Sequence, residues 1–367
     1  MSGWPEADRE LRESLLVLCE HSVGLDDATS WPSASLGSLG ESGVLGWVIP
    51  CEYGGGGVEE SRLVAGYLQM SRACLPTAFI LTQRNAACQR FAVSENESLK
   101  ADLLPRLTAA DRFATVGISH LTTSRQHLDQ PAVRVVLDGS HVRLDGIVPW
   151  VTGAGQADWV LTGGSCEDGT QVLVALPMDA SGITVLPAPS LLALDSSQTA
   201  SIRLDQVVLD SSMLVAGPAP SIMQGGSGGG GGTGSLGTSA LALGAASASL
   251  DRLSVEASNR PDLGEVLDPL LAERDGVVSD LLTAAGACVE SDAVELTTES
   301  LRQRSNSLVL RSAAAYLGAS KGAGFTASHP ASRAVRESMF FLVWSCPQAV
   351  LAANLREFAV GAERFGC

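Results

Sequence analysis

The chain has 367 residues, of which 45% are hydrophobic and 17% charged, and it carries a net charge of −16 at pH 7. This composition excludes general disorder and predicts two or three folded domains. Nucleic acids and anionic membrane surfaces bind basic faces, so the acidic balance argues against both as partners. One or two local arginines can still bind a phosphate in such a protein.

The cysteines and histidines indicate a reduced protein without a metal site. The eight cysteines are scattered without a C-x-x-C pair, and the five histidines show no metal-ligand spacing. No basic region precedes an apolar core at the N-terminus, so no signal peptide is predicted. The small-apolar stretch 239–250 is too short and too rich in Ala and Ser to span a bilayer. We expect a soluble, cytoplasmic protein with no membrane partner.

Hydrophobic periodicity divides the chain into three regions. Over residues 1–112 apolar residues recur at helical spacing, for example within 11–19 and 63–68, which predicts an N-terminal helical domain. Over 113–214 the period falls to two. Here Val133–Leu137 runs through Asp138-Gly139, a hairpin signal, into residues 141–144. Further strands are predicted near residues 159–161, 171–176, 183–185 and 200–204.

These short strands, with no helices expected between them, predict an antiparallel β-barrel or sandwich. Residues 215–236 include a glycine tract that matches G-x-G-x-x-G in several ways. Because a dinucleotide fingerprint requires a parallel βαβ unit around it, we interpret this tract as a flexible linker. Over 237–367 the helical period returns, with stretches from about 238 and near 265–288, 292–318 and 331–360. They predict a C-terminal four-helix bundle and an α+β multidomain fold.

The segment Gly146–Ala154 is the first candidate for function. Trp150 and Thr152 lie two residues apart, so in an extended strand both would point the same way. An indole face and a hydroxyl at one place suit a flat conjugated ligand such as a flavin. The alternative for a Trp in an alternating strand is simple packing in the core.

The order of the three regions and several short motifs resemble the acyl-CoA dehydrogenase flavoproteins. Five segments carry the resemblance, and their order and spacing agree with the family: Gly46–Gly55 (P-x-E-Y-G-G), Trp150–Thr152 (W-I-T), Ser196–Thr199 (G-S-x-T), Arg260–Gly264 (R-x-x-F-G) and Gly322–Glu337 (G-x-G-F, P and R-D). The resemblance covers nearly the whole chain.

The resemblance implies an FAD-binding oxidoreductase that acts on a CH–CH bond of an acyl-CoA or a related thioester and converts it into a C=C double bond. Trp150 would then pack against the isoalloxazine, while Thr152 and Ser119 would bond its polar edge. Arg260 would bind the FAD pyrophosphate of a neighbouring subunit, which implies a homodimer or homotetramer. A separate flavoprotein would accept the electrons.

Two departures from the family pattern affect the chemistry. The family's T-E-P-x-x-G-S-D turn falls on residues 119–126, where only the hydroxyl of Ser119 is kept. Arg125 replaces a small residue there, and it either pairs with the pyrophosphate or is solvated. The family's catalytic glutamate falls on Ser345, and a second family location for it falls near Gly234-Ser235, so neither position holds a carboxylate.

A serine hydroxyl is a poor base, and losing a positioned base costs ~10²–10⁴ in rate. We consider His120 the first candidate for a replacement base. Glu337 is expected to form a structural ion pair with a nearby arginine, and His329 has no visible partner. Two alternatives remain open: a flavin-dependent monooxygenase of the same fold, whose reaction need not use the glutamate, and a non-catalytic flavoprotein-like subunit with a decayed site.

Overall fold

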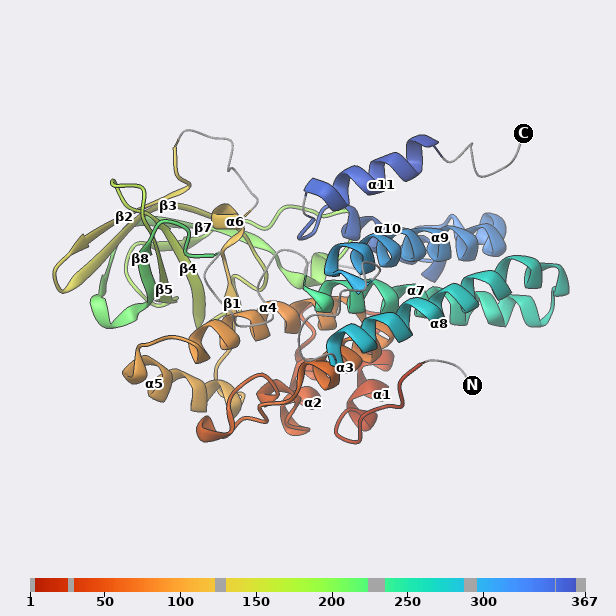
Figure 1. Cartoon of the computed structure of the whole chain (residues 1–367), viewed down its shortest axis with the longest axis horizontal. Helices are drawn as coiled ribbons and strands as arrows, with labels where there is room; N and C mark the ends of the chain where they lie inside the picture. Colours follow the sequence, from red (N-terminus) through yellow and green to blue (C-terminus); the bar gives the residue numbers. More distant parts are fainter. Residues whose placement is uncertain are drawn as a thin grey trace. The chain divides into compact units, whose positions relative to one another are not determined.

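A computed structural model describes residues 4–25, 30–122, 130–223, 235–286, 296–346 and 348–360 (Figure 1). The chain folds into two compact units. The helical unit contains residues 1–26, 59–78 and 233–367, and the sheet unit contains 27–58 and 79–232. The order of N-terminal helices, central sheet and C-terminal helices is as predicted, and it confirms the α+β class.

The N-terminal helical region is divided between the two units, so the proposed domain boundary after residue 112 stays a prediction. Residues Leu214–Ala219 form a strand that pairs with the sheet, so this part of the predicted linker 215–236 is strand. The glycine tract itself, at 224–234, lies outside the described residues.

The sheet unit is built on one eight-stranded sheet with the order β6-β7-β3-β2-β4-β5-β8, and β1 pairs with β4. Its strands are β1 (Ala114–Val116), β2 (Val133–Asp138), β3 (His141–Val151), β4 (Trp159–Ser165), β5 (Gln171–Pro177), β6 (Ile183–Val185), β7 (Ala200–Asp210) and β8 (Leu214–Ala219). The hairpin at Asp138-Gly139 is confirmed, since Asp138 pairs with His141 and Gly139 has a φ of 56°.

Antiparallel pairing, as predicted, joins most of these strands. The exceptions are the parallel pairs β1–β4 and β2–β4, the latter through the single pair Arg134 and Ser165. A short helix, α6 (Ser119–Thr122), which the sequence did not predict, follows β1.

The central strands are buried on both faces, which fixes the position of the core. In β5, Leu173 and Ala175 join a cluster with helices α4 (Leu75–Ala92) and α5 (Glu97–Thr108). Val172 and Val174 join the opposite cluster, which is shared with β2, β3 and β7. The remaining helical segments of this unit are α2 (Ser33–Glu41), η1 (Val44–Gly46), η2 (Cys51–Tyr53), η3 (Asp195–Ser197) and η4 (Ser211–Met213).

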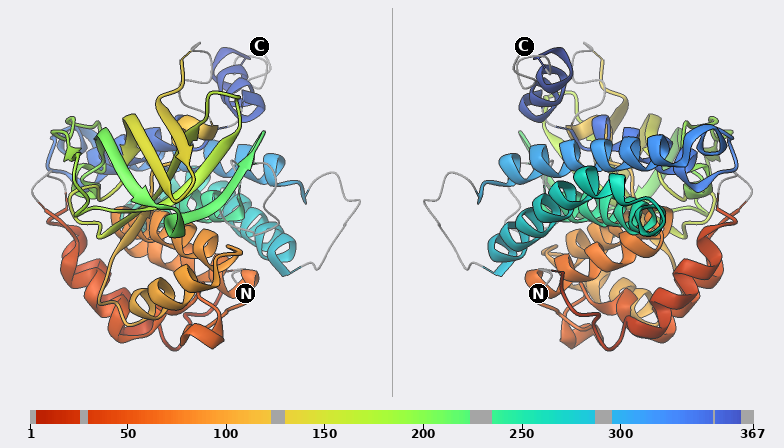
Figure 2. Two further views of the ribbon diagram at one scale, coloured as in Figure 1. Left: turned by 90° about the vertical axis from the view of Figure 1, so that its left-hand side faces the viewer. Right: turned by 90° about the vertical axis from the view of Figure 1, so that its right-hand side faces the viewer.

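The helical unit is organised around helix α7 (Leu236–Ser258), most of whose residues are buried. Its other helices are α1 (Arg12–Ser22), α3 (Glu60–Ala73), η5 (Pro261–Leu263), α8 (Gly264–Gly286), α9 (Thr298–Gly324), α10 (Pro330–Met339), η7 (Phe340–Leu342) and α11 (Gln348–Val360). Figure 2 shows α7, α8 and α9 as neighbours, and each pair is in contact.

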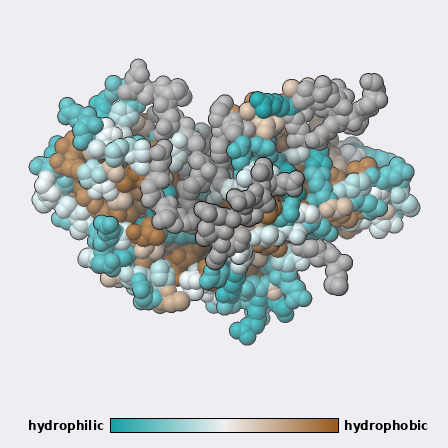
Figure 3. All heavy atoms as spheres, viewed as in Figure 1, coloured by the Kyte–Doolittle hydropathy of each residue, from teal (hydrophilic) through white to brown (hydrophobic). Residues whose placement is uncertain are grey.

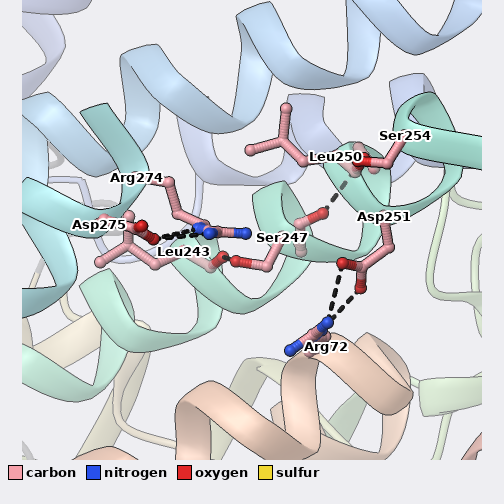
Figure 4. Close-up of polar contacts among 10 residues, drawn as sticks. Arg72, Leu243, Ser247, Leu250, Asp251, Ser254, Arg274 and Asp275 are labelled. Carbon is pink, nitrogen blue, oxygen red and sulfur yellow. Dashed lines mark hydrogen bonds and ion pairs between the residues drawn. The ribbon is translucent and has the colours of Figure 1, made fainter. Parts of the chain in front are cut away.

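Helices α3 and α7 approach closely and are joined by polar contacts. Arg72 donates two hydrogen bonds to the carboxylate of Asp251, at 2.6 and 2.8 Å (Figure 4). A Cβ atom at Gly244 would lie 2.6 Å from the carbonyl oxygen of Leu68, so only glycine fits this crossing. The hydroxyl of Ser71 also donates to the carbonyl of Leu241 at 2.7 Å.

The fourth helical stretch of the C-terminal region is interrupted, which corrects the prediction of one long helix over 331–360. Helix α10 ends at Met339, and α11 begins only at Gln348. Between them Ser345 has a φ of 44°, which lies outside the range of a right-handed helix. The sequence places a proline at 347, and proline disfavours helical geometry in the residue before it.

Hydrophilic and hydrophobic residues are interspersed over the face drawn in Figure 3. No helix in the described residues is both long enough and apolar enough to cross a membrane.

Candidate functional site

Trp150 is presented to solvent by an irregularity near the end of β3. Val148 pairs with Ile202 and Val151 with Ala200, so β3 has one more residue than β7 between these pairs. Pro149 has no N–H to donate across the ladder, which favours a bulge at this point. Both valines are fully buried, whereas Trp150 is 56% exposed and has a φ of 56°. The alternative that Trp150 packs in the core of the sheet is therefore wrong.

Thr152 does not share a face with Trp150, contrary to the expectation from simple alternation. The bulge breaks the two-residue period, and Thr152 is only 3% exposed. Its Oγ1 lies 3.2 Å from Oγ1 of Thr199, which is 2.8 Å from Oγ of Ser197. The N–H of Gly153 donates to the carbonyl of Ser197 at 2.9 Å. This buried chain of hydroxyls anchors the segment that follows Trp150.

Ser119 lies beside the residue that precedes Trp150. Its Oγ donates to the carbonyl of Pro149 at 3.2 Å, so the structure brings Ser119 and the bulge together. The close approach also depends on Gly117, where a Cβ atom would lie 2.7 Å from Cγ1 of Val148. Ser119 is half-buried, and its hydroxyl bonds the backbone one residue before the exposed Trp150.

His120 is buried in the sheet unit. Its Nε2 lies 3.0 Å from the carbonyl oxygen of Gly163 in β4, and this distance requires Nε2 to carry the proton and donate it. A ring held in this way serves the packing of α6 on the sheet, which counts against a role as the replacement base. Arg125 lies outside the described residues, so its contact with a pyrophosphate stays a prediction.

Arg260 follows the C-terminal end of α7 and is half-buried. Its Nη2 donates to Oε2 of Glu256 at 3.2 Å and to the carbonyl of Ala319 at 2.7 Å. These contacts tie α7 to α9 and hold the guanidinium in place, while its other nitrogens can still bind an anion. Its role at a neighbouring subunit stays a prediction.

Ser345, at the family's base position, lies in the segment 340–346 between α10 and α11 and is half-buried. Burial raises the pKa of the neighbouring Cys346 thiol, although the positive charge of Arg302 acts in the opposite direction. Ser235, at the second family location, precedes the first residue of α7. Gly234 lies outside the described residues.

The two other residues weighed as bases have structural partners. Nε of Arg333 donates to Oε1 of Glu337 at 2.7 Å, which confirms the predicted ion pair. Nδ1 of His329 accepts the N–H of Ala331 at 3.1 Å and caps α10. The sequence showed no partner for His329, although Pro330 in the next position is a signal for a helix start.

Arg302 is the residue of this region that the sequence did not single out. It is fully buried on α9 and donates to the carbonyl of Trp344 at 2.9 Å. Helical periodicity gave no indication of this, because a charged residue in an amphipathic helix is expected on its solvent face.

Comparison with known proteins agrees with this geometry. Residues 6–111 match the family described as acyl-CoA dehydrogenase, N-terminal domain. The probable acyl-CoA dehydrogenase fadE25 of Mycobacterium leprae (strain TN) is 22% identical, over 91% of this chain and 90% of its own length. The glutaryl-coenzyme A dehydrogenase glutaryl-CoA complex has a TM-score of 0.79 at 18% identity, covering 97% of this chain and 96% of that one. A nitrososynthase from Micromonospora carbonacea var. africana has a TM-score of 0.77 at 17% identity, covering 98% of this chain and all (100%) of that one.

The fold is therefore that of the acyl-CoA dehydrogenases, with N-terminal helices, a central sheet and C-terminal helices. The N-terminal region matches the acyl-CoA dehydrogenase N-terminal domain, and relatives at about 22% identity extend the similarity over most of the chain, as expected for a divergent relative of these enzymes. The family resemblance inferred from the motifs is confirmed.

Proposed function

We propose that this protein binds FAD and is an acyl-CoA dehydrogenase-like oxidoreductase acting on the CH–CH bond of an acyl thioester. The observation that carries the proposal is Trp150, a large indole that is 56% exposed near the end of β3. A positive φ is an outlier for a bulky residue, and such strain is concentrated at functional sites. An exposed aromatic face suits the stacking of a flavin ring, and the hydroxyl of Ser119 bonds the residue before it.

The residues present fit the cofactor in chemical type. Trp150 would pack against the isoalloxazine, and Ser119, whose hydroxyl now donates to Pro149, could bond the polar edge of the ring instead. Thr152 is bonded inside the sheet unit, so its contribution would be to hold the end of β3 in place. Arg260, and also Arg125, would bind pyrophosphate oxygens, with Arg260 acting on a neighbouring subunit of a homodimer or homotetramer.

Bound FAD would accept a hydride from the β-carbon of the substrate and pass its electrons to a flavoprotein acceptor. The chain itself must remove the α-proton, yet Ser345 and Ser235 offer hydroxyls where a carboxylate would serve as base. We therefore expect the natural protein to dehydrogenate straight-chain acyl-CoA slowly.

A second function is a flavin-dependent oxygenation on the same fold. The observation that favours it is the fold shared with a nitrososynthase, because one fold can carry different reactions. The loss of the glutamate position fits this reading, and it also fits a non-catalytic subunit.

The first experiment is an absorbance spectrum of the purified protein, with and without added FAD. We expect a flavin spectrum that is perturbed on binding, and weaker binding in Trp150→Ala than in Trp150→Phe. Val208→Ala is the matched control, since Val208 is 52% exposed on β7 of the same unit. Failure of the natural protein to bind FAD would refute the proposal and favour the non-catalytic subunit.

The second experiment separates the two reactions in protein that holds flavin. Anaerobic bleaching of the flavin by acyl-CoA indicates dehydrogenation. Consumption of reduced flavin that depends on oxygen and on a second substrate indicates oxygenation.

A further inference from the structure

The segment 340–346, which we call the elbow, leads from α10 toward α11 (Figure 1). Two polar side chains of helix α9 bond its backbone. Nη2 of Arg302 donates to the carbonyl of Trp344 at 2.9 Å, and Nδ2 of Asn306 donates to the carbonyl of Phe341 at 3.0 Å. Arg302 and Asn306 are four residues apart and therefore lie on one face of the helix. Both are fully buried, so the elbow is fastened to the interior of the helical unit.

The aromatic residues of the elbow surround the guanidinium of Arg302. Its central carbon lies 5.7 Å from the ring centroids of both Phe341 and Trp344, within the range of cation–π attraction. Trp344 is in turn stacked on Phe340, with 5.0 Å between centroids and 13° between planes. The guanidinium thus holds the elbow through one carbonyl and two rings.

Burying the guanidinium of Arg302 at this position has a cost in free energy, because the charge is removed from water. Burial lowers its pKa to about 10, so it remains charged at neutral pH. Its Nε and Nη1 have no hydrogen-bond acceptor in the described part of the chain, and the charge interaction that raises its pKa is with the Cys346 thiol, not with a carboxylate. A methionine would fill a similar volume without the cost of burying a charge. A role in packing alone therefore does not account for an arginine.

The bond from Arg302 acts directly on the backbone of Ser345. The carbonyl of Trp344 and the N–H of Ser345 belong to one planar peptide group, so fixing the oxygen fixes the plane from which residue 345 continues. Ser345 leaves that plane with a φ of 44°, a conformation that persists only where surrounding contacts impose it.

We propose that Arg302 is a positioning residue, which holds the elbow and thereby sets the direction of the side chain at position 345. Its importance for catalysis rests on the proposed function, in which residue 345 occupies the family's base position. The positioning of the backbone by Arg302 does not depend on the proposed function. The backbone role and the catalytic role are therefore tested separately.

The test compares the natural protein with Arg302→Met and Arg302→Lys by site-resolved hydrogen exchange and by the rate at which a thiol reagent labels Cys346. In the elbow the N–H groups of Val343 and Trp344 donate to the carbonyl of Phe340, at 3.1 and 2.9 Å. We expect Arg302→Met to speed their exchange and the labelling of Cys346 by about tenfold or more, as for loss of a hydrogen bond from a charged donor. Arg302→Lys keeps one donor, so it should give an intermediate rate.

The matched control is Arg304→Met on the same helix. Arg304 is partly exposed and pairs with Asp280 at 2.7 Å, so its loss should leave exchange in the elbow unchanged. An elbow that exchanges at the natural rate in Arg302→Met overturns the proposal. So does a uniform increase across the helical unit together with a lower unfolding midpoint, because that result shows a general structural role.

The effect of Arg302 on catalysis is measured in the Ser345→Glu variant, where residue 345 carries a carboxylate. There Arg302→Met should lower kcat with little change in KM, since it displaces the base without touching the substrate. Absence of any activity in Ser345→Glu would contradict the proposed function, while the exchange data would still decide the positioning role. Faster exchange in the elbow with an unchanged kcat would limit Arg302 to the backbone and overturn its part in catalysis.

Discussion

Replacing Ser345 with glutamate should raise the rate of acyl-CoA dehydrogenation, which we expect to be slow in the natural protein. Gaining a positioned base is worth ~10²–10⁴ in rate, which is ~3–5 kcal/mol at ~1.4 kcal/mol per tenfold. Residue 345 is half-buried and already has a φ of 44°, so the backbone strain is present with serine and glutamate adds little. Ordering the longer side chain costs ~1–2 kcal/mol. The expected net gain is therefore ~10–10³ in rate.

The assay is the anaerobic rate at which a series of acyl-CoA thioesters bleaches the bound flavin. Ser345→Gln is the matched control, because it has nearly the same shape and no carboxylate. A gain in Ser345→Glu alone supports the reasoning. If Ser345→Glu binds FAD normally and bleaches no faster than Ser345→Gln, the elbow does not present residue 345 to the substrate, and the oxygenase or the decayed subunit is favoured. Rapid bleaching in the natural protein would show that another residue is the base.

Three further predictions concern stability and assembly. Gly244→Val should lower the free energy of unfolding by ~1–3 kcal/mol, because its Cβ would lie 2.6 Å from the carbonyl oxygen of Leu68. Urea-induced unfolding measures this, and an unchanged unfolding midpoint would contradict the close crossing of α3 and α7. The hydrogen bond from Arg62 lowers the pKa of Asp8 below its usual 3.8, so its stabilisation is present above that value and is lost as pH falls through the lower, folded-state pKa. Asp8→Asn should flatten this acid-induced loss, and identical pH profiles would refute it. The protein should be a dimer or tetramer at micromolar concentration by light scattering, whereas a monomer that still holds flavin would exclude the proposed role of Arg260 across subunits.

Much of the fold could be predicted because local periodicity reports burial. Residues 133–137 and the short apolar run 171–176 were predicted as strands, and they form β2 and β5 in the structure. The turn at Asp138-Gly139 was predictable because a two-residue hairpin loop requires positive φ, which glycine adopts without strain. The resemblance to the acyl-CoA dehydrogenases followed from the order and spacing of motifs, each of which is weak when taken singly.

The candidate site was less predictable, because it depends on partners that are distant in the sequence. The register between β3 and β7 breaks the alternation at Trp150 and turns the indole outward while Thr152 is buried. No pattern within residues 146–154 specifies that register. In the same way, the burial of Arg302 depends on the aromatic residues of the elbow some forty positions later, which periodicity along one helix cannot show.

The amino-acid sequence alone therefore predicted the type of most elements, the main hairpin and the family resemblance. These features depend on short-range geometry and on the spacing of residues along the chain. The three-dimensional packing was needed to show that Trp150 is exposed, that His329 caps α10, and that Arg302 bonds the carbonyl before Ser345. Those facts depend on contacts between segments far apart in the chain, where burial and hydrogen bonding outweigh local preference.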